Sequence, residues 1–367
     1  MPLPYRLRLP GPTAVPDRVQ DAIARPVVNH RGPEFRAVFD RAEELIRPIL
    51  GTSHPVFFFA SSGTGMMEAA LVNVLAPGER ALISAHGQFG ERFAEIARSL
   101  GAGVETIETP WGRPLDPADV ERRLAHAQYR AVVIVHNESS TGVVADIASI
   151  GALLRGRPEL LVVDSVSGLG GIEMRQDEWG VDIVASSCQK ALMCPPGIGI
   201  LSMSPKAWQI VNRNDRLPRY YWDLRKAKEA VESSGTPFTT PVTLMAGVRE
   251  ALEMIHEEGL QQVLERHRRL STKLRAGCQA LGLPSFPKES LSNTVVCLEV
   301  PAPWDGRTII RNLYDRHGTV IAGSRNQLEG RVIRIGTMGW VHDEDIATDL
   351  AQLKETLTGL KEAAHAR

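Results

Sequence analysis

The sequence has little lysine, few cysteines and no large excess of charge of either sign. Only eight of its 42 basic residues are lysines, and with 43 acidic residues the formal net charge is −1. A chain this close to neutrality has no overall field that would attract nucleic acid or an anionic membrane. Neither is therefore expected as a partner, and a lysine in an apolar setting is unusual in this chain.

Long apolar runs and targeting signals are also missing. No stretch approaches the roughly 18 apolar residues that a membrane-spanning helix needs. The first residues, MPLPYRLRLPGP, are broken by proline and contain no apolar core of a signal peptide. The cysteines lack the short spacings of a metal site and fit reduced thiols better than a disulfide framework; they are Cys188, Cys194, Cys278 and Cys297. We therefore expect a cytoplasmic protein without a bound metal.

Between residues 55 and 190, continuous apolar runs alternate with segments whose apolar residues recur at helical spacing. This alternation predicts an α/β fold, with a mainly parallel central sheet covered by helices on both faces. In such a sheet, the polar residues that follow the carboxyl ends of the strands face a ligand crevice.

After about residue 250 the pattern changes. It predicts a long helix over 243–282, strands over 293–301 and 331–339, and a last helix over roughly 343–363. We therefore expect three parts, namely an N-terminal arm over 1–15, a large domain over 16–250 and a smaller α+β domain over 251–367.

Small residues mark one candidate ligand site. In the stretch ASSGTGMME, an apolar strand turns into a helix at Ser62, Gly63 and Thr64. Free N–H groups at such a helix start favour an anion, usually a phosphate, although an ordinary helix cap has the same sequence. The stretch is neither a Walker A loop nor a dinucleotide fingerprint, because the required lysine and glycines are absent.

A carboxylate and a lysine complete a set. Asp164 ends the apolar run LLVVD, and Lys190 follows 26 residues later in IVASSCQKALMCPPGIGIL. On its own, Asp164 could equally be a cap or a salt-bridge partner, and Lys190 a surface lysine. Together with the phosphate-type helix start, they match what pyridoxal phosphate requires, which is an anion cradle, a carboxylate for its pyridine nitrogen and an amine for its aldehyde.

These motifs resemble class V pyridoxal-phosphate-dependent aminotransferases of the alanine–glyoxylate and serine–glyoxylate branch. Similar blocks run from residue 10 to about 340, and they are PGPTAVP, SSGTGMMEAALVNVLAPGE, VHNESSTGV, VVDSVSGLGG, SCQKALMCPPGIGIL, TPFTTPVTLMAGVREAL and VIRIGTMG. The resemblance implies the pyridoxal-phosphate aminotransferase fold, and it implies roles for individual residues.

By this resemblance, Lys190 forms the Schiff base with the cofactor and later moves a proton. Asp164 pairs with the pyridine nitrogen, so that the ring can accept electrons. Gln189 and the helix start at Ser62, Gly63 and Thr64 hold the phosphate.

The resemblance also implies residues around the cofactor ring and the substrate. Val166 packs on one ring face, and Phe89 stands where relatives often carry a stacking tryptophan. Ser139 lies near the ring 3′-oxygen, and Arg334 binds the substrate α-carboxylate, which a planar guanidinium suits well. The neighbouring Arg331 is expected on the surface.

A homodimer is implied as well. Thr236 and Thr239, in GTPFTTP, match a block that the partner subunit contributes to the cofactor phosphate. Some relatives have tyrosine at the position of Thr236, so the prediction is stronger for Thr239.

Two residues depart from the family pattern. Cys188 replaces a frequent serine, which removes one hydroxyl from the expected phosphate site. Asn137 stands where glycine is frequent, which would narrow the substrate pocket.

The resemblance implies transamination between a small amino acid, alanine or serine, and a 2-oxo acid such as glyoxylate or pyruvate. Aminoethylphosphonate–pyruvate and broad aspartate specificities remain alternatives. A pyridoxal-phosphate lyase or desulfurase is a further one, but a desulfurase needs a mobile cysteine, whereas Cys297 lies in an apolar run and Cys278 on a helix. A non-enzymatic binding protein would be expected to lose Lys190 or Asp164.

Overall fold

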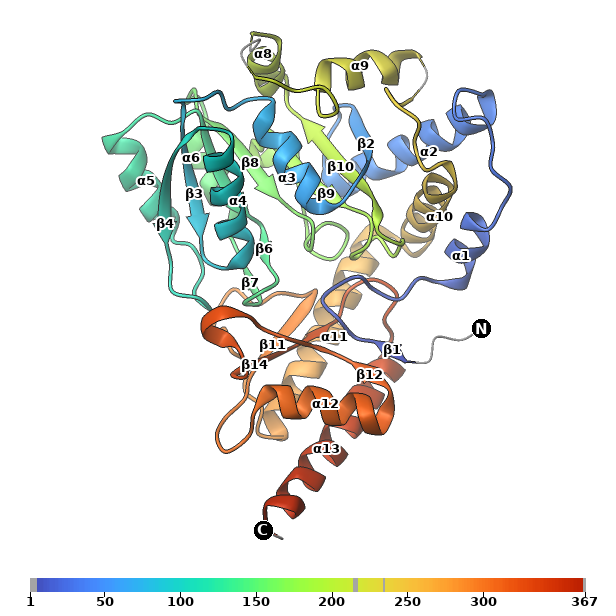
Figure 1. Cartoon of the computed structure of the whole chain (residues 1–367), viewed down its shortest axis with the longest axis vertical. Helices are drawn as coiled ribbons and strands as arrows, with labels where there is room; N and C mark the ends of the chain where they lie inside the picture. Colours follow the sequence, from blue (N-terminus) through green and yellow to red (C-terminus); the bar gives the residue numbers. More distant parts are fainter. Residues whose placement is uncertain (1–4, 214–216, 234, 366–367) are drawn as a thin grey trace.

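The computed structural model describes residues 5–213, 217–233 and 235–365 (Figure 1). A seven-stranded sheet in the order β2-β10-β9-β8-β5-β3-β4 forms its centre. The strands are β2 (Val56–Ser61), β3 (Arg80–Ala85), β4 (Gly103–Glu108), β5 (Ala131–Val135), β8 (Leu160–Asp164), β9 (Ile183–Ser187) and β10 (Gly197–Met203). Strands β4, β3, β5, β8 and β9 pair in parallel, and β10 runs antiparallel to β9 and β2. The predicted mainly parallel sheet is therefore confirmed.

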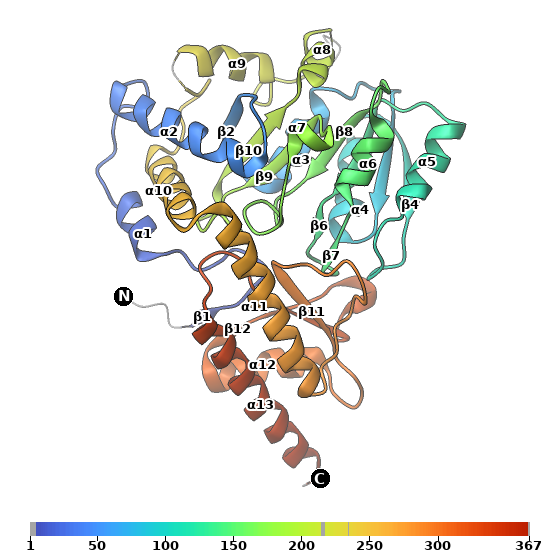
Figure 2. The same cartoon turned by 180° about the vertical axis from the view of Figure 1, so that it is seen from behind.

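Both faces of this sheet are buried, as its apolar strands require. In β5, Val132 and Ile134 belong to one hydrophobic core, whereas Val133 and Val135 belong to the other. The first core includes residues of helices α1 (Asp17–Ile23), α2 (Pro33–Leu50), α5 (Pro117–His126), α6 (Ile147–Leu154) and α10 (Val242–Glu258), seen in front in Figure 2. The second includes residues of α3 (Gly63–Val72), α4 (Gln88–Ser99), α8 (Pro205–Arg213) and α9 (Leu224–Ser233).

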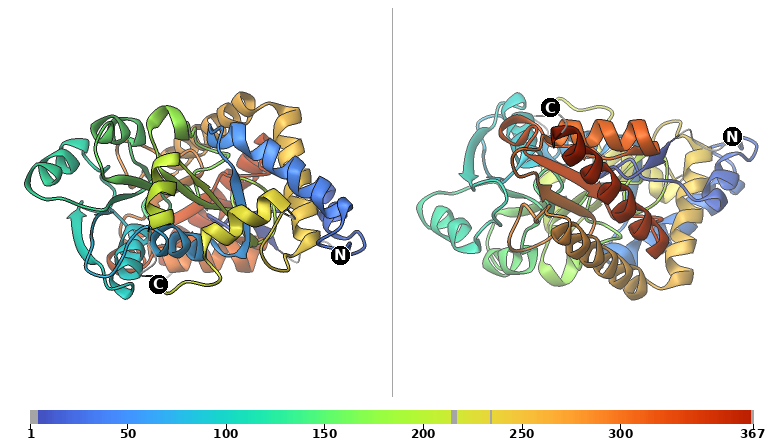
Figure 3. Two further views of the ribbon diagram at one scale, coloured as in Figure 1. Left: turned by 90° about the horizontal axis from the view of Figure 1, so that it is seen from above. Right: turned by 90° about the horizontal axis from the view of Figure 1, so that it is seen from below.

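The C-terminal part has its own sheet and core. Strand β14 (Val332–Gly336) lies between β11 (Val295–Glu299) and β13 (Ala322–Gly323). Helices α11 (Leu260–Ala280), α12 (Gly306–His317) and α13 (Asp343–His365) cover it, and the view from below shows α11, α12 and α13 beside one another (Figure 3). The predicted domain limits at residues 15 and 250 remain predictions.

Short strands connect distant parts of the chain. The N-terminal β1 (Arg6–Leu7) pairs in parallel with β12 (Thr319–Val320), so the expected arm lies against the C-terminal part. Strands β6 (Asn137–Glu138) and β7 (Val143–Val144) form a hairpin after β5, and α7 (Gln176–Trp179) precedes β9. None of the described helices has both the length and the apolar composition needed to cross a membrane.

One predicted element is wrong. The single helix expected over 243–282 is two helices, because α10 ends at Glu258 and α11 begins at Leu260. Between them Gly259 has φ +90°, a conformation that only glycine adopts readily and that interrupts helical hydrogen bonding. The apolar spacing continues across this glycine, which is why periodicity alone missed the break.

Gly151 tests the packing of α6 against α7. A Cβ added there would overlap the carbonyl oxygen of Trp179, so we expect Gly151→Ala to lower the melting temperature by a few degrees. Overpacking costs about 1–3 kcal/mol, which exceeds the roughly 1 kcal/mol that alanine adds to a helix. Thermal unfolding followed by circular dichroism measures the effect.

The matched control is Gly359→Ala in α13, where the added Cβ would meet only the end of the Arg316 side chain. This variant should melt at or slightly above the wild-type temperature. An unchanged melting temperature for Gly151→Ala would contradict the tight α6–α7 contact.

Candidate active site

The candidate residues converge at the carboxyl edge of the central sheet. Asp164 is the last residue of β8, and Lys190 follows the end of β9 by three residues. Because β8 and β9 are parallel neighbours, both side chains emerge at the same edge. Asp164 is only 3% exposed, and Lys190 is partly buried. The structure thus brings together the carboxylate and the amine that the sequence singled out.

The N-terminal arm holds the Lys190 amine. Its Nζ donates a hydrogen bond of 2.5 Å to the carbonyl oxygen of Pro10, and the Thr13 hydroxyl donates to the Lys190 carbonyl oxygen at 3.1 Å. Burial, assisted by the positive charges of Arg334 and Arg92, lowers the pKa of Lys190 to about 8, although Asp164 opposes the shift. The unprotonated amine, which a nucleophilic lysine requires, is therefore easier to reach near neutral pH than it is for an exposed lysine.

Burial has the opposite effect on the Asp164 carboxyl. It raises the pKa of Asp164 to about 7, and the negative charge of Glu138 adds to the rise. A hydrogen bond of 2.7 Å from the Val166 N–H, together with Lys190 and Arg92, opposes it. A cationic N–H donor bound at this carboxylate would favour its ionised form.

The start of α3 forms the candidate anion site. Ser62 caps the helix, since its hydroxyl accepts a hydrogen bond of 3.2 Å from the Gly65 N–H. A Cβ added at Gly63 would lie 2.8 Å from Val166 Cγ2 and 3.1 Å from Ser187 Oγ. Only glycine fits here, so the start of α3 packs directly against Val166 and Ser187.

Two buried polar atoms near the start of α3 have no hydrogen-bond partner among the described residues, namely Ser187 Oγ and Gln189 Oε1. Buried polar groups are nearly always hydrogen-bonded in folded proteins. The first N–H groups of α3 likewise have no acceptor within the helix. A polar, anionic group bound at the start of α3 would suit this set, so the residues present fit the phosphate of pyridoxal phosphate.

Phe89 and Thr64 are linked through an arginine. Phe89 lies in the first turn of α4, and the Arg92 guanidinium lies 4.8 Å from the centre of its ring. The same guanidinium donates to the Thr64 hydroxyl at 3.0 Å. Arg92 therefore connects the aromatic candidate to the candidate phosphate site.

Arg334 is held by the backbone. Its Nε and Nη2 donate to the Gly323 carbonyl oxygen at 2.8 and 2.6 Å, and its Nη1 donates to the Ser139 carbonyl oxygen at 2.9 Å. Three of the five guanidinium N–H groups are thus used, and two remain for a carboxylate. Arg334 lies on the central strand β14 rather than on an edge, and burial lowers the pKa of its guanidinium. Arg331 is exposed, as expected.

The two threonines of the expected partner block lie apart from this cluster. Thr236 is buried and its hydroxyl donates to the Phe238 carbonyl oxygen at 3.0 Å, whereas Thr239 is exposed. No hydrogen bond within the described residues joins either one to Lys190 or Asp164.

Cys188 and Asn137, the two residues that depart from the family pattern, both make hydrogen bonds within the fold. Cys188 is buried and its Sγ donates to the Pro195 carbonyl oxygen at 3.0 Å. The Asn137 amide donates to Ser167 Oγ at 2.7 Å and to Thr294 Oγ1 at 2.9 Å, so this amide joins the central sheet to the C-terminal part.

Sequence reasoning missed three contributors, which are Pro10, Glu138 and Ser187. The hydroxyl that Cys188 lacks is available one residue earlier, at Ser187. Ser187 could have been found as a serine beside a recognised motif, and Glu138 as a glutamate three residues after the end of a strand.

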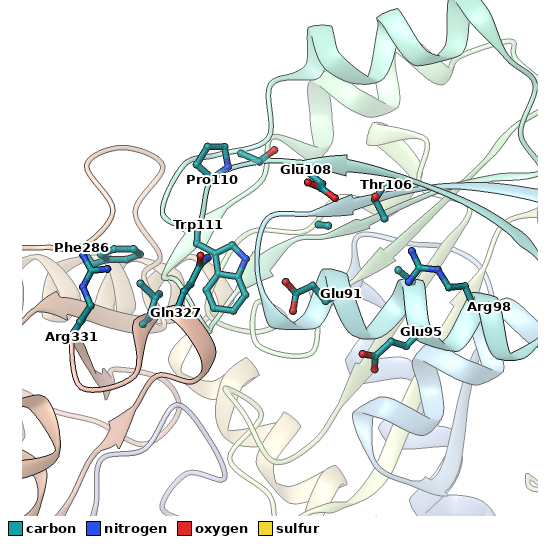
Figure 4. A pocket seen from close by; sticks show the side chains of 14 residues that line it. Glu91, Glu95, Arg98, Thr106, Glu108, Pro110, Trp111, Phe286, Gln327 and Arg331 are labelled. Carbon is teal, nitrogen blue, oxygen red and sulfur yellow. The ribbon is translucent and has the colours of Figure 1, made fainter.

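A separate cavity of about 870 Å³ lies beside α4, between the large sheet and the C-terminal part (Figure 4). Glu91, Glu95 and Arg98 line it from one side of α4. Lys190 and Asp164 are not among the lining residues. This cavity is therefore distinct from the cluster at the carboxyl edge.

Comparisons with known proteins extend over nearly the whole chain. The model of the family described as aminotransferase class-V matches residues 12–329. The soluble hydrogenase small subunit of Synechococcus sp. is 36% identical over 358 residues, which cover 96% of this chain and 93% of that protein. The serine–glyoxylate aminotransferase of Methylorubrum extorquens is 35% identical over 363 residues, which cover 96% of this chain and 90% of that protein. The crystal structure of alanine–glyoxylate aminotransferase from Nostoc sp. has a TM-score of 0.94 at 31% identity, covering 97% of this chain and 96% of that one.

The raised pKa of Asp164 predicts how stability depends on pH. In the protein prepared without cofactor, folded Asp164 keeps its proton between about pH 4 and pH 7, where the unfolded chain has released it. Its contribution to the free energy of unfolding therefore falls as the pH rises through this window. Asparagine does not ionise, so we expect Asp164→Asn to gain in melting temperature over the wild type from pH 4 to pH 7.

Differential scanning fluorimetry of both cofactor-free proteins across this range measures the gain. Asp315→Asn, at an exposed position on α12, serves as the control and should show no such trend. A difference between Asp164→Asn and wild type that stays constant with pH would contradict the raised pKa.

Proposed function

Since the chain belongs to the class V aminotransferase family and is an aminotransferase, we propose that it uses pyridoxal phosphate to transfer an amino group between a small amino acid, alanine or serine, and a 2-oxo acid such as glyoxylate or pyruvate. This membership confirms the family that the motifs predicted. The observation that carries the proposal is the convergence of Lys190, Asp164 and the start of α3 at one edge of the sheet. The glyoxylate specificity of similar enzymes supports the choice of substrates.

Several residues would hold the cofactor. Its phosphate would lie at the start of α3 with Ser62, Gly63 and Thr64, and the unpartnered groups of Ser187 and Gln189 would complete the site.

The cofactor ring would lie between Val166 and Phe89, with Asp164 at the pyridine nitrogen and Ser139 near the 3′-oxygen. When bound, pyridoxal phosphate supplies a carbonyl that accepts an amino group and a pyridinium ring that withdraws electrons from neighbouring atoms.

Lys190 has two roles in the proposal. Its Nζ would hold the cofactor, and its free amine would supply the base that accepts and returns a proton. A pKa of about 8 suits both steps, because the amine gains and loses its proton close to neutral pH. The Pro10 carbonyl oxygen, 2.5 Å from Nζ, keeps the lysine side chain at the crevice.

Arg334 orients the substrate. Its two remaining N–H groups would bind the α-carboxylate that amino acids and 2-oxo acids share. Because three other N–H groups already bind backbone carbonyls, the guanidinium is fixed before substrate enters, which lowers the entropic cost of orienting it.

The active form is proposed to be a homodimer with shared sites. Thr239 is exposed on its own chain and lies outside the hydrogen-bonded cluster at Lys190. In the family, this block reaches the cofactor phosphate of the other subunit, and an exposed Thr239 is compatible with that arrangement.

Other reactions on this scaffold have less support. A broad aspartate specificity requires a second cation for the distal carboxylate, and Arg92 beside Thr64 is a candidate for it. A desulfurase requires a mobile thiol, but Cys278 and Cys297 are 0% and 2% exposed.

Half-reactions with a panel of amino acids test the function. Alanine, serine, aspartate and aminoethylphosphonate are each mixed with the purified holoenzyme, and the absorbance change from the aldehyde to the amine form of the cofactor is recorded. Fast conversion by alanine or serine, reversed by glyoxylate or pyruvate, is the expected result. Conversion by aspartate alone would replace the proposed specificity, and no conversion by any donor would contradict transamination.

Lys190→Ala should abolish turnover while leaving cofactor binding measurable. The phosphate and ring contacts remain in this variant, but the group that moves the proton is lost, so we expect turnover to fall by more than about 10³-fold. Coupled assays and equilibrium dialysis measure the two properties. Lys273→Ala, at a surface lysine of α11, is the control and should retain wild-type turnover. Wild-type-like turnover in Lys190→Ala would contradict its assigned role.

Mixing two inactive variants tests the shared site. In a hybrid of Lys190→Ala and Thr239→Trp subunits, one site carries both lesions and the other carries neither. After random subunit exchange, we expect the mixture to regain about a quarter of wild-type activity. Mixing Lys190→Ala with Lys190→Arg should regain none. No regain despite exchange shown by mass spectrometry, or full activity in a protein that sediments as a monomer, would contradict sharing.

A further inference from the structure

Glu138 is a fully buried carboxylate that acts on Asp164 through its charge and also binds two segments beside the site. It lies in β6, directly after the end of β5, and is 0% exposed. Its Oε2 accepts hydrogen bonds from the N–H groups of Phe89 and Gly90 at 2.9 and 3.2 Å. Its Oε1 accepts from the N–H and the hydroxyl of Ser140 at 3.1 and 2.5 Å. One side chain therefore binds the start of α4 and the β6–β7 hairpin.

The donors around Glu138 fit its ionised form. Burial raises the pKa of Glu138, whereas the hydrogen bonds from Ser140, Gly90 and Phe89 lower it. Three of the four groups at the two oxygens are backbone N–H groups, which can only donate, so they favour the ionised carboxylate. The dipole of α4 also favours a negative charge at its first turn. The geometry is that of a carboxylate.

On one side, Glu138 determines where α4 begins. The two N–H groups that it binds belong to the turn that carries Phe89. The Ser140 hydroxyl, which donates to Glu138, also accepts from the Gln88 N–H at 3.0 Å. Gly87 has no space for a side chain, because an added Cβ would lie 2.5 Å from Glu138 Cδ and 2.6 Å from Ser140 Oγ.

On the other side, Glu138 fixes the hairpin that holds Arg334. Ser139 lies between Glu138 and Ser140, and its carbonyl oxygen accepts the 2.9 Å hydrogen bond from Arg334 Nη1. The Ser140 carbonyl oxygen accepts from the Ser324 hydroxyl at 3.3 Å, in the segment that also binds Arg334 through Gly323. A shift at Ser140 would therefore reach the guanidinium.

We propose that Glu138 is a positioning residue that aligns Phe89 at the cofactor ring with Arg334 at the substrate carboxylate. This role rests on the proposed function, in which Phe89 and Arg334 have those tasks. The carboxylate binds the Phe89 N–H directly, and it reaches Arg334 through the hairpin carbonyl of Ser139 and through its charge.

Glu138→Gln separates the two sides of this arrangement. The amide oxygen can still accept from the N–H groups of Phe89 and Gly90, but the NH₂ group must then face Ser140. The Ser140 N–H loses its acceptor, and its hydroxyl proton loses one as well, so the disturbance falls mainly on the hairpin that binds Arg334. Glu138→Ala removes the acceptor on both sides.

The test measures KM, kcat, cofactor Kd and melting temperature of the holoenzymes, with glyoxylate and the donor found active in the half-reactions. We expect Glu138→Gln to raise the KM for both substrates by about 10- to 100-fold, while cofactor Kd and absorbance stay near wild type. Glu138→Ala should raise KM and also weaken cofactor binding. Glu159→Gln, at another buried glutamate (1% exposed) paired with Arg157, should change the melting temperature only.

Should Glu138→Ala fail to fold, Ser140→Ala gives the second test. It removes one donor to the carboxylate, and it should raise KM in the same direction as Glu138→Gln but by less. A Glu138→Gln protein with a lowered melting temperature and wild-type KM would overturn the proposal, because the carboxylate would then be only structural. A wild-type protein with no cofactor-dependent turnover would overturn the proposed function itself, and the positioning role with it.

Discussion

The parallel pairing of β3, β5, β8 and β9 is the constraint on which the candidate site depends. The carboxyl ends of parallel strands lie at one edge of the sheet. Residues that are far apart in the sequence therefore meet there, among them Phe89, Glu138, Asp164 and Lys190. The antiparallel β10, which follows the Pro195-Pro196 segment, closes the turn that carries Lys190. Both faces of the sheet are covered by apolar helices, so this edge and its polar side chains are the part of the sheet left for ligand chemistry.

Buried charges of both signs are balanced within this edge. Lys190 and Arg92 interact electrostatically with Asp164, Arg334 acts on Lys190, and the charge of Glu138 acts on both Asp164 and Arg334. Burial disfavours the charged forms of Lys190, Asp164, Glu138 and Arg334, and hydrogen bonds or opposite charges partly offset this effect. Burial, more than these charges, brings the pKa of Lys190 to about 8 and that of Asp164 to about 7.

Sequence reasoning recovered what local pattern encodes. The apolar runs predicted the parallel sheet. Motifs at its strand ends pointed to Asp164, Lys190 and the start of α3, which the structure brings to one edge. It failed at Gly259, where one residue with positive φ breaks a helix without breaking the apolar spacing. It also missed Glu138, because the N–H group of Phe89 that this carboxylate binds lies 49 positions away in the sequence. The role of Thr239 depends on a second subunit, which no pattern within one chain describes.

The central claim is that Lys190 is the residue that binds the cofactor, and chemical trapping tests it most directly. Holoenzyme is treated with borohydride to make the link between cofactor and amine permanent, digested, and mapped by mass spectrometry. The account predicts the added mass on the peptide that contains Lys190, and its loss when an amino acid donor is added before reduction. Added mass on another of the eight lysines, or none in a protein that turns over, would contradict it.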